Sequence, residues 1–266
     1  MKKIKELMNL DGRKALVIGG AGFIGKALCE SLAELGAALA VHDIAVSKSA
    51  PVAEEIRDEY KVKTTAVGGD LLDEDQTGKI VPSAVKELGG LDILVHCAAF
   101  VGTTNFPGWA EPFEKQSVQA FEAALKVNLT SAFSLVKDAS IPLAAGGRGS
   151  MIMVSSIYGL VPPDFSLYEG TSMANPAGYG ASKAGLLGLT RYLATLLAPR
   201  IRVNAITPGG VFRNQPEVFV DRYNKKTPMG RMAVEEDMKG AVAFLASDLS
   251  AYVTGQNIIV DGGFTL

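Results

Sequence analysis

The sequence predicts a single α/β domain with a doubly wound, mostly parallel sheet of seven strands and helices on both faces, as in Rossmann-type folds. Short, almost continuously apolar runs alternate with longer segments of helical periodicity along the chain. Strands of that kind are buried on both faces, which is typical of parallel sheets covered by helices. The composition shows no shift that would mark a second domain, and 48% hydrophobic residues over 266 positions suffice for one large core. We therefore expect one domain over residues 1–266.

The pattern places the elements after a short N-terminal extension, residues 1–10. Strands are expected at residues 14–19, 38–42, 63–67, 92–96, 150–154, 202–206 and 257–260, and helices at residues 22–35, 52–60, 74–88, 117–144, 179–197 and 235–246. Three longer connections, at about residues 100–112, 160–176 and 210–234, leave carboxyl ends of strands. Ligands of doubly wound folds bind at that edge of the sheet, so we expect these connections to border a substrate cleft.

The charge balance and the absence of export signals limit the expected partners. Against 28 Asp and Glu residues stand 26 Lys and Arg residues, and the net charge of −2 makes nucleic acid and anionic membranes unexpected partners. The chain starts without an apolar leader and has no run of 18 apolar residues, so we expect a cytoplasmic protein. Cys29 and Cys97 are expected to be buried thiols, and with only His42 and His96 as imidazoles no metal site is expected.

A glycine-rich turn follows the first strand. Gly19, Gly22 and Gly25 stand between that strand and a helix, a context that favours tight approach of a diphosphate to the helix start. Asp43 ends the second strand, where a carboxylate can accept hydrogen bonds from the adenosine ribose and would repel a 2′-phosphate. The sequence therefore predicts a dinucleotide site that prefers NAD. NADP remains open because Lys26 or Lys48 could receive its phosphate.

Tyr179 and Lys183 are the candidate proton-transfer pair. At i and i+4 of a helix they share one face, and a cation near a phenol lowers its pKa. The spacing also arises by chance on many helices, so the pair gains meaning from the other motifs.

Those motifs make the chain similar to the short-chain dehydrogenase/reductase family over almost its whole length. Besides the glycine-rich turn and the Tyr179/Lys183 pair, the motifs in family order are Gly69-Asp70-Leu71, Asn128 in Lys126-Val127-Asn128-Leu129, Ser155-Ser156, Pro208-Gly209 and Val260-Asp261-Gly262-Gly263. The length resembles the compact single-domain branch. Family resemblance further implies a homotetramer.

The resemblance implies a role for each matching residue. Tyr179 would be the general acid/base, Ser156 would bind the substrate oxygen, Lys183 would lower the tyrosine pKa and bind the nicotinamide ribose, and Asn128 would hold a relay water. Ser155 is the alternative serine. Beyond these residues, cofactor contacts are implied for Gly19, Gly22, Phe23, Ile24, Gly25, Asp43, Asp70, Leu71, Ala98, Pro208, Gly209 and Val211.

Departures from the family pattern point to the substrate side. His96-Cys97-Ala98-Ala99 replaces Asn-Asn-Ala-Gly, and we interpret His96 as a satisfied packing residue. Ser156 and Tyr179 are 23 positions apart, about ten more than in the compact branch, and a second extension reaches Trp109. The inserted segments are polar and aromatic, with Asn105, Trp109, Tyr168 and Glu169, and the segment after Pro208-Gly209 adds Arg213, Asn214 and Gln215, a set that suits a hydroxylated ligand. The insertion resembles short-chain dehydrogenases of bacterial sugar modification, including flagellin-glycan pathways.

The sequence thus predicts an NAD(P)-dependent oxidoreductase that transfers hydride between a nicotinamide cofactor and a secondary alcohol or carbonyl, with a sugar derivative as the favoured small-molecule substrate. Two alternatives remain at this point. One is a reductase of 3-oxoacyl thioesters, and the other is a non-catalytic dinucleotide-binding sensor.

Overall fold

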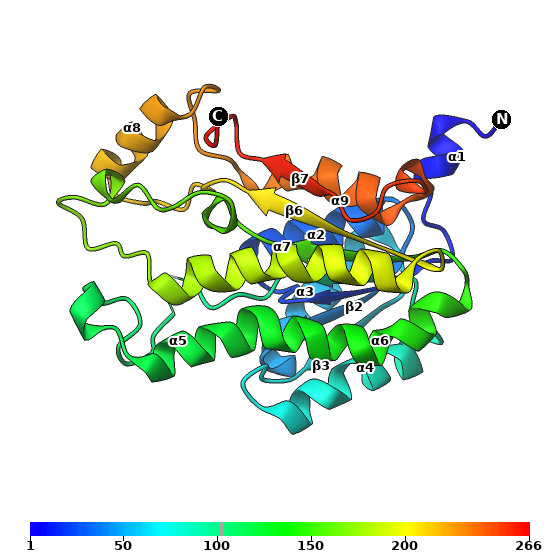
Figure 1. Ribbon diagram of the computed structural model, residues 1–266. Coiled ribbons are helices and arrows are strands. Elements are labelled where there is room, and N and C mark those ends of the chain that lie inside the picture. Colours follow the sequence, from blue (N-terminus) through cyan, green and yellow to red (C-terminus); the bar gives the residue numbers. More distant parts are fainter. Residues whose placement is uncertain (102–103) are drawn as a thin grey trace.

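The computed structural model, which describes residues 1–101 and 104–266, has a central parallel sheet between two helical layers (Figure 1). Its seven strands are β1 (Lys14–Ile18), β2 (Ala38–Asp43), β3 (Thr64–Gly68), β4 (Ile93–His96), β5 (Gly149–Val154), β6 (Ile201–Pro208) and β7 (Asn257–Val260). They are ordered β3-β2-β1-β4-β5-β6-β7, and every neighbouring pair is parallel. The predicted doubly wound fold is confirmed, with a sheet that is wholly parallel.

The helices cover the sheet from both sides. They are α1 (Ile4–Met8), α2 (Phe23–Glu34), α3 (Val46–Tyr60), α4 (Glu74–Leu88), α5 (Val118–Leu125), α6 (Ser131–Ala145), α7 (Ala177–Leu197), α8 (Glu217–Lys226) and α9 (Lys239–Ala246). Short 3₁₀ turns lie at Phe113–Lys115, Ile157–Gly159, Phe165–Leu167, Glu235–Met238 and Asp248–Ser250. Helices α4, α6 and α7 pack on one face, and α2, α3 and α9 on the other.

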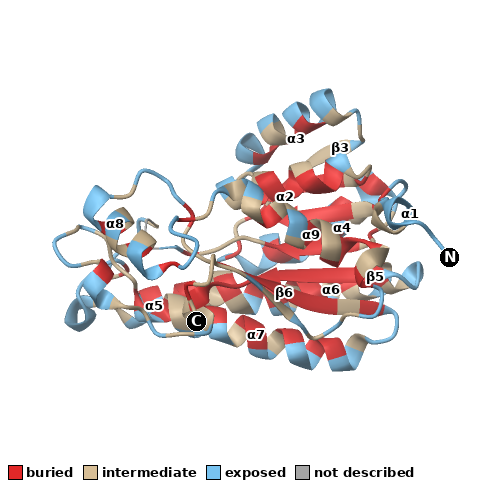
Figure 2. Ribbon diagram, turned by 90° about the horizontal axis from the view of Figure 1, so that it is seen from above, coloured by how far each residue is buried: buried red, intermediate tan, exposed pale blue. Residues whose placement is uncertain are grey.

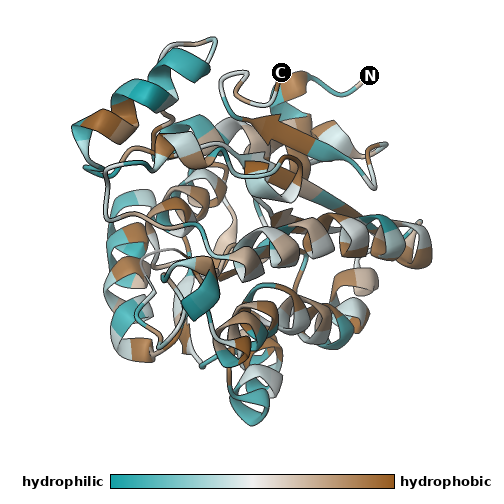
Figure 3. Cartoon of the chain, turned by 60° about the vertical axis from the view of Figure 1, so that its left-hand side comes forward, coloured by the Kyte–Doolittle hydropathy of each residue, from teal (hydrophilic) through white to brown (hydrophobic). Residues whose placement is uncertain are grey.

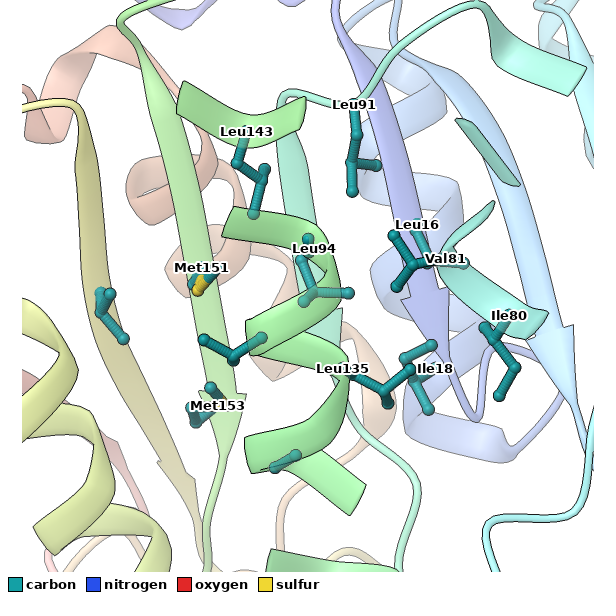
Figure 4. Packing of buried hydrophobic residues seen from close by; sticks show 14 of the residues in the cluster. Leu16, Ile18, Ile80, Val81, Leu91, Leu94, Leu135, Leu143, Met151 and Met153 are labelled. Carbon is teal, nitrogen blue, oxygen red and sulfur yellow. The ribbon is translucent and has the colours of Figure 1, made fainter. Parts of the chain in front are cut away.

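Alternation of side chains along each strand supplies both cores. In β1, Leu16 and Ile18 point toward α4 and α6, whereas Ala15 and Val17 point toward α2, and all four are fully buried. Figure 4 shows Leu135 and Leu143 of α6 above Met151, Leu94 and Ile18 on the sheet. Burial on both faces explains why the strands read as continuous apolar runs. Figure 2 shows the same burial concentrated along the strands.

Three expectations about the helices need correction. Helix α3 begins at Val46 and not near residue 52, because the Ser49 hydroxyl bonds the Val67 carbonyl of β3 at 3.0 Å and ties an earlier turn to the sheet. The helix expected at 117–144 is interrupted by a π-helical turn, Lys126–Thr130. The helix expected at 235–246 begins as a 3₁₀ turn, and α9 proper starts at Lys239. The short α1 lies in the expected extension.

The connection expected over 210–234 also contains a helix. Helix α8 buries Phe219 and Tyr223, one turn apart, in a small cluster beside the strand ends. Its polar remainder gave no helical pattern. In Figure 1, α8 lies beyond the tip of the β6 arrow, at the edge where the strands end.

Candidate active site

The site lies at the carboxyl edge of the sheet, where strand order reverses between β1 and β4. Gly19 follows β1 and Ala98 follows β4, and the two backbones touch. A Cβ atom on Gly19 would lie 2.7 Å from the Ala98 Cα atom, and Gly19 has a φ of +75°. Only glycine fits this crossing, because any larger side chain would meet the backbone of the neighbouring connection.

The glycine-rich turn leads directly into α2. The Gly22 carbonyl accepts the Lys26 amide at 2.7 Å, so the amides of Phe23 and Ile24 lie in the first turn, where they have no intrahelical partner. A Cβ atom on Gly25 would collide with the Gly19 carbonyl. The turn therefore brings bare backbone and a helix amino terminus to the sheet edge, which is the geometry of an anion site.

Two carboxylates leave neighbouring strands beside this turn. Asp43 ends β2, and its backbone carbonyl accepts the Gly69 amide at 3.1 Å, one residue before Asp70. Each carboxylate caps its own turn: Oδ1 of Asp43 accepts the Ile44 amide and Oδ1 of Asp70 accepts the Leu72 amide, both at 2.9 Å. The glycine turn together with Asp43 fits an adenine dinucleotide, with diphosphate at the helix start and ribose near the carboxylate.

On the opposite side of the edge, α7 carries Tyr179 and Lys183. Lys183 is 1% exposed, and its Nζ donates to the Val154 carbonyl at 2.8 Å while lying 5.8 Å from the centre of the Tyr179 ring. Burial lowers the pKa of Lys183 to about 8.

The expected lowering of the Tyr179 pKa by Lys183 is not what the structure shows. Burial raises the pKa of Tyr179, and the opposing contributions come from a hydrogen bond with Ser156 and from the charge of Arg213. At neutral pH the phenol is therefore protonated, which is the form that can donate a proton.

The two candidate serines face different neighbours. The Ser155 hydroxyl donates to the Lys183 carbonyl at 2.9 Å and so joins β5 to the helix backbone. The Ser156 hydroxyl accepts the Tyr158 amide at 3.2 Å and interacts with the Tyr179 phenol. This geometry favours Ser156 as the serine beside the phenol.

Asn128 lies in the π-helical turn and is fully buried. Its Oδ1 accepts the Phe100 amide at 2.6 Å, and its Nδ2 donates to the Ser182 hydroxyl at 2.9 Å. Ser182 in turn donates to the Tyr179 carbonyl at 2.7 Å. The Asn128 amide therefore joins the connection after β4 to the second turn of α7.

Trp109 has a different environment from the one expected. Its side chain is 1% exposed, and its Nε1 donates to the Val101 carbonyl at 2.7 Å. The indole packs edge-on against Phe100 and lies against Gly178, next to Tyr179. The Trp109 side chain is buried against the start of α7 and is therefore not accessible to a ligand. Gly102 and Thr103 of the same extension lie outside the described residues.

Hydrogen bonds and an ion pair join the long insertion before α7 to α8. Nη1 of Arg222 donates to the carbonyls of Ser166 and Glu169 at 3.1 and 2.6 Å, and Lys226 pairs with Asp164 at 2.7 Å. The Tyr168 ring packs on Phe219 with centres 5.3 Å apart. Insertion and α8 thus form one joined wall beside the strand ends.

That wall carries a polar cluster. The hydroxyls of Tyr158 and Tyr168 lie 2.6 Å apart, and Nδ2 of Asn175 donates to the Tyr168 hydroxyl at 3.3 Å. Oδ1 of Asn175 is buried and has no hydrogen-bond partner among the described residues. These three side chains also line a groove of about 870 Å³ whose walls include Gly180, Ala181 and Ala184 of α7.

The remaining motif residues lie as expected at the sheet edge. Pro208 ends β6, the Gly209 amide donates to the Val260 carbonyl at 2.9 Å, and Val211 pairs with Ala233. Leu71 is buried beside Asp70. In the described part of the chain, no three His, Cys, Asp or Glu side chains come together as a metal site.

The motif order and this geometry agree with the comparison to known families. A short-chain dehydrogenase model described as enoyl-(acyl carrier protein) reductase matches residues 20–265. The chain belongs to the short-chain dehydrogenase/reductase family.

Relatives in this family cover the chain almost completely. The 3-oxoacyl-(acyl-carrier-protein) reductase of Aquifex aeolicus is 32% identical over 96% of this chain and 98% of its own. A short-chain dehydrogenase from Leptospira borgpetersenii, solved with bound NAD⁺, is 33% identical with a TM-score of 0.83, covering 100% of this chain and 97% of that one. A gluconate 5-dehydrogenase from Burkholderia cenocepacia, solved with NADP and tartrate, is 27% identical with a TM-score of 0.85 and covers 99% of both chains.

His96 departs from the packing role expected for it in one respect. Its Nε2 is 3.0 Å from the Ser131 hydroxyl, but Nδ1 has no partner among the described residues. Burial lowers the pKa of His96 to about 3, so the ring is neutral.

Ser182 and Tyr158 are site residues that the sequence reasoning missed. Ser182 stands inside the Tyr179–Lys183 run, three positions after the tyrosine, and its helical spacing could have marked it as inward-facing. No signal in the sequence pairs Tyr158 with Tyr168, because their contact depends on how the insertion folds back.

Proposed function

We propose that this protein is an NAD(P)-dependent oxidoreductase that transfers hydride between a nicotinamide cofactor and a secondary alcohol or carbonyl. One observation carries the proposal: the Ser156 hydroxyl and the Tyr179 phenol meet at the same sheet edge as the glycine-rich turn.

No helix of the described residues is long and apolar enough to span a bilayer.

The chain's own groups would manage the proton. The nicotinamide ring supplies or accepts the hydride when bound. In reduction, Ser156 donates a hydrogen bond to the substrate carbonyl oxygen and the protonated phenol of Tyr179 gives that oxygen its proton. In oxidation the same groups act in reverse. Lys183, in its charged form, stabilises the phenolate that remains and binds the nicotinamide ribose.

We infer that NAD is the preferred cofactor. Asp43 at the end of β2 supports this, because its carboxylate suits a ribose with free hydroxyls and repels a 2′-phosphate. Lys26 is a weak phosphate ligand, since its Nζ is paired with Glu55 at 2.6 Å. Implied cofactor contacts of Asp70, Leu71, Ala98, Pro208, Gly209 and Val211 are part of this proposal.

A hydroxylated substrate, such as a sugar derivative, is favoured over an apolar one. The Tyr158–Tyr168–Asn175 cluster supports this, since one polar atom of the Asn175 amide is left without a partner whichever way the amide faces. The gluconate 5-dehydrogenase relative acts on a polyhydroxylated acid, in keeping with the same choice. The 3-oxoacyl reductase of Aquifex aeolicus keeps thioester reduction as the second candidate.

A homotetramer is the assembly that we propose. Several large apolar side chains lie on the outer faces of α5, α6 and α7, namely Val118, Phe133, Ile141, Tyr192 and Leu196, all more than half exposed. Figure 3 shows hydrophobic residues among hydrophilic ones on the outward surfaces of the helices. Burial of such surfaces favours association, and a monomeric mass in solution would contradict it.

Replacement of the phenol tests the acid/base role. Tyr179→Phe should lower turnover roughly 100- to 10,000-fold, because a positioned proton donor contributes about that much, while the Kd for NADH stays within about twofold. The control is Tyr252→Phe, which removes a phenol hydroxyl from a fully exposed position. Wild-type reduction should slow as the pH rises through about 8, where Lys183 loses its proton. Near-normal turnover of Tyr179→Phe would refute the role.

A substrate panel tests cofactor and substrate class together. We expect the KM for NAD to be at least about tenfold below that for NADP, and polyols or sugar acids to be oxidised with higher kcat/KM than unsubstituted cyclic alcohols. Tyr168→Phe should reduce that advantage roughly tenfold, because it deletes one buried hydroxyl.

A tenfold preference for NADP contradicts the cofactor assignment. Faster turnover of 3-oxoacyl thioesters favours the second candidate, and no turnover of any compound with NADH still bound favours a sensor.

A further inference from the structure

Arg213 contacts the start of α2, next to the glycine-rich turn, from the β6 side of the sheet edge. It follows β6, which is separated from β1 in the sheet by β4 and β5. Its guanidinium carbon nevertheless lies 4.5 Å from the centre of the Phe23 ring, at the start of α2. Phe23 is 69% exposed and comes directly after Gly22, so its contact with Arg213 lies at the mouth of the turn.

Two hydrogen bonds hold Arg213 in place, and most N–H donors of its guanidinium have no partner among the described residues. Its Nε donates to Oε1 of Glu235 at 3.2 Å, and its backbone amide donates to Oε1 of Gln215 at 2.6 Å. No other hydrogen bond joins the guanidinium to the described residues. Five N–H donors in a planar fork match the geometry of phosphate oxygens, so four of them are available here for a ligand.

Two other cations near this edge have shorter side-chain contacts than the 3.2 Å contact of Arg213 with Glu235. Lys26 is paired with Glu55 at 2.6 Å, and Lys183 donates to the Val154 carbonyl at 2.8 Å. The glycine turn and the start of α2 offer backbone amides but no charge of their own beyond the helix dipole. A diphosphate carries two negative charges, and a guanidinium beside the turn would complement them.

The position of Arg213 also spans both halves of the site. Its charge lowers the pKa of Tyr179 and of Cys97, although burial outweighs this effect in both groups. It therefore lies near the proton-transfer centre as well as the glycine turn. In a dinucleotide, the diphosphate is the part that joins the adenosine and nicotinamide ends.

We propose that Arg213 is a cofactor-binding residue that holds the diphosphate of the dinucleotide from the β6 side, with the Phe23 ring as its platform. This inference rests on the proposed function for the identity of the cofactor. It adds an ionic contact to the backbone contacts of the turn.

The test is calorimetric titration of NADH and of ADP, which shares the diphosphate, into the purified full-length protein. Arg213→Gln should raise the Kd of both ligands about tenfold or more, because it removes charge-assisted hydrogen bonds. Arg213→Lys, which keeps the charge without the fork, should lose less. Phe23→Leu should raise both Kd values severalfold by releasing the guanidinium.

Arg231→Gln is the matched control. It removes one positive charge from the same connection, where Arg231 pairs with Asp237 at 2.6 Å, and should leave both Kd values within about twofold. Circular dichroism should confirm that every variant is folded. Unchanged Kd values for Arg213→Gln overturn the inference, and a raised KM for an anionic substrate alone would assign Arg213 to the substrate. If the wild type binds neither NADH nor ADP, the proposed function fails with it.

Discussion

The active site depends on the hydrogen bonds of one buried amide, that of Asn128. The side chain accepts a hydrogen bond from the Phe100 backbone amide after β4 and donates one to the Ser182 hydroxyl in the second turn of α7. Because both ends are buried, loss of either bond would leave an unsatisfied polar group and cost about 1–3 kcal/mol. The π-helical turn at Lys126–Thr130 is the local deviation that holds this amide between the two elements.

The residues that stabilise the fold and the residues expected to carry the chemistry lie in different parts of the molecule. Both faces of the sheet are filled with apolar side chains, so polar groups gather where the strands end. Gly19 and Ala98 approach each other closely on the side of the edge proposed for the cofactor. Lys183 lies on the opposite side, where its Nζ donates to the carbonyl of Val154 at the end of β5. The insertion and α8, joined through Arg222, add a wall beside the strand ends.

The sequence allowed all seven strands and the order of the motifs to be predicted, because continuous apolar runs and glycine turns are local signals. The start of α3 was missed since Pro51 reads as a helix boundary, whereas the contact of Ser49 with β3 is remote in sequence. Helix α8 was missed because two aromatic anchors are too few for a periodic pattern. The pKa of Tyr179 was assigned the wrong direction, since burial, which only the fold reveals, outweighs the nearby charge.

We expect Asn128 to support proton transfer at Tyr179 through Ser182, and a double-mutant cycle on turnover measures this coupling directly. Asn128→Ala and Ser182→Ala should each lower kcat by roughly tenfold, and the double variant should be little slower than either, because both substitutions break the same link. NADH affinity should stay within about twofold throughout. Losses that multiply in the double variant would show that the two residues act independently and would contradict the account.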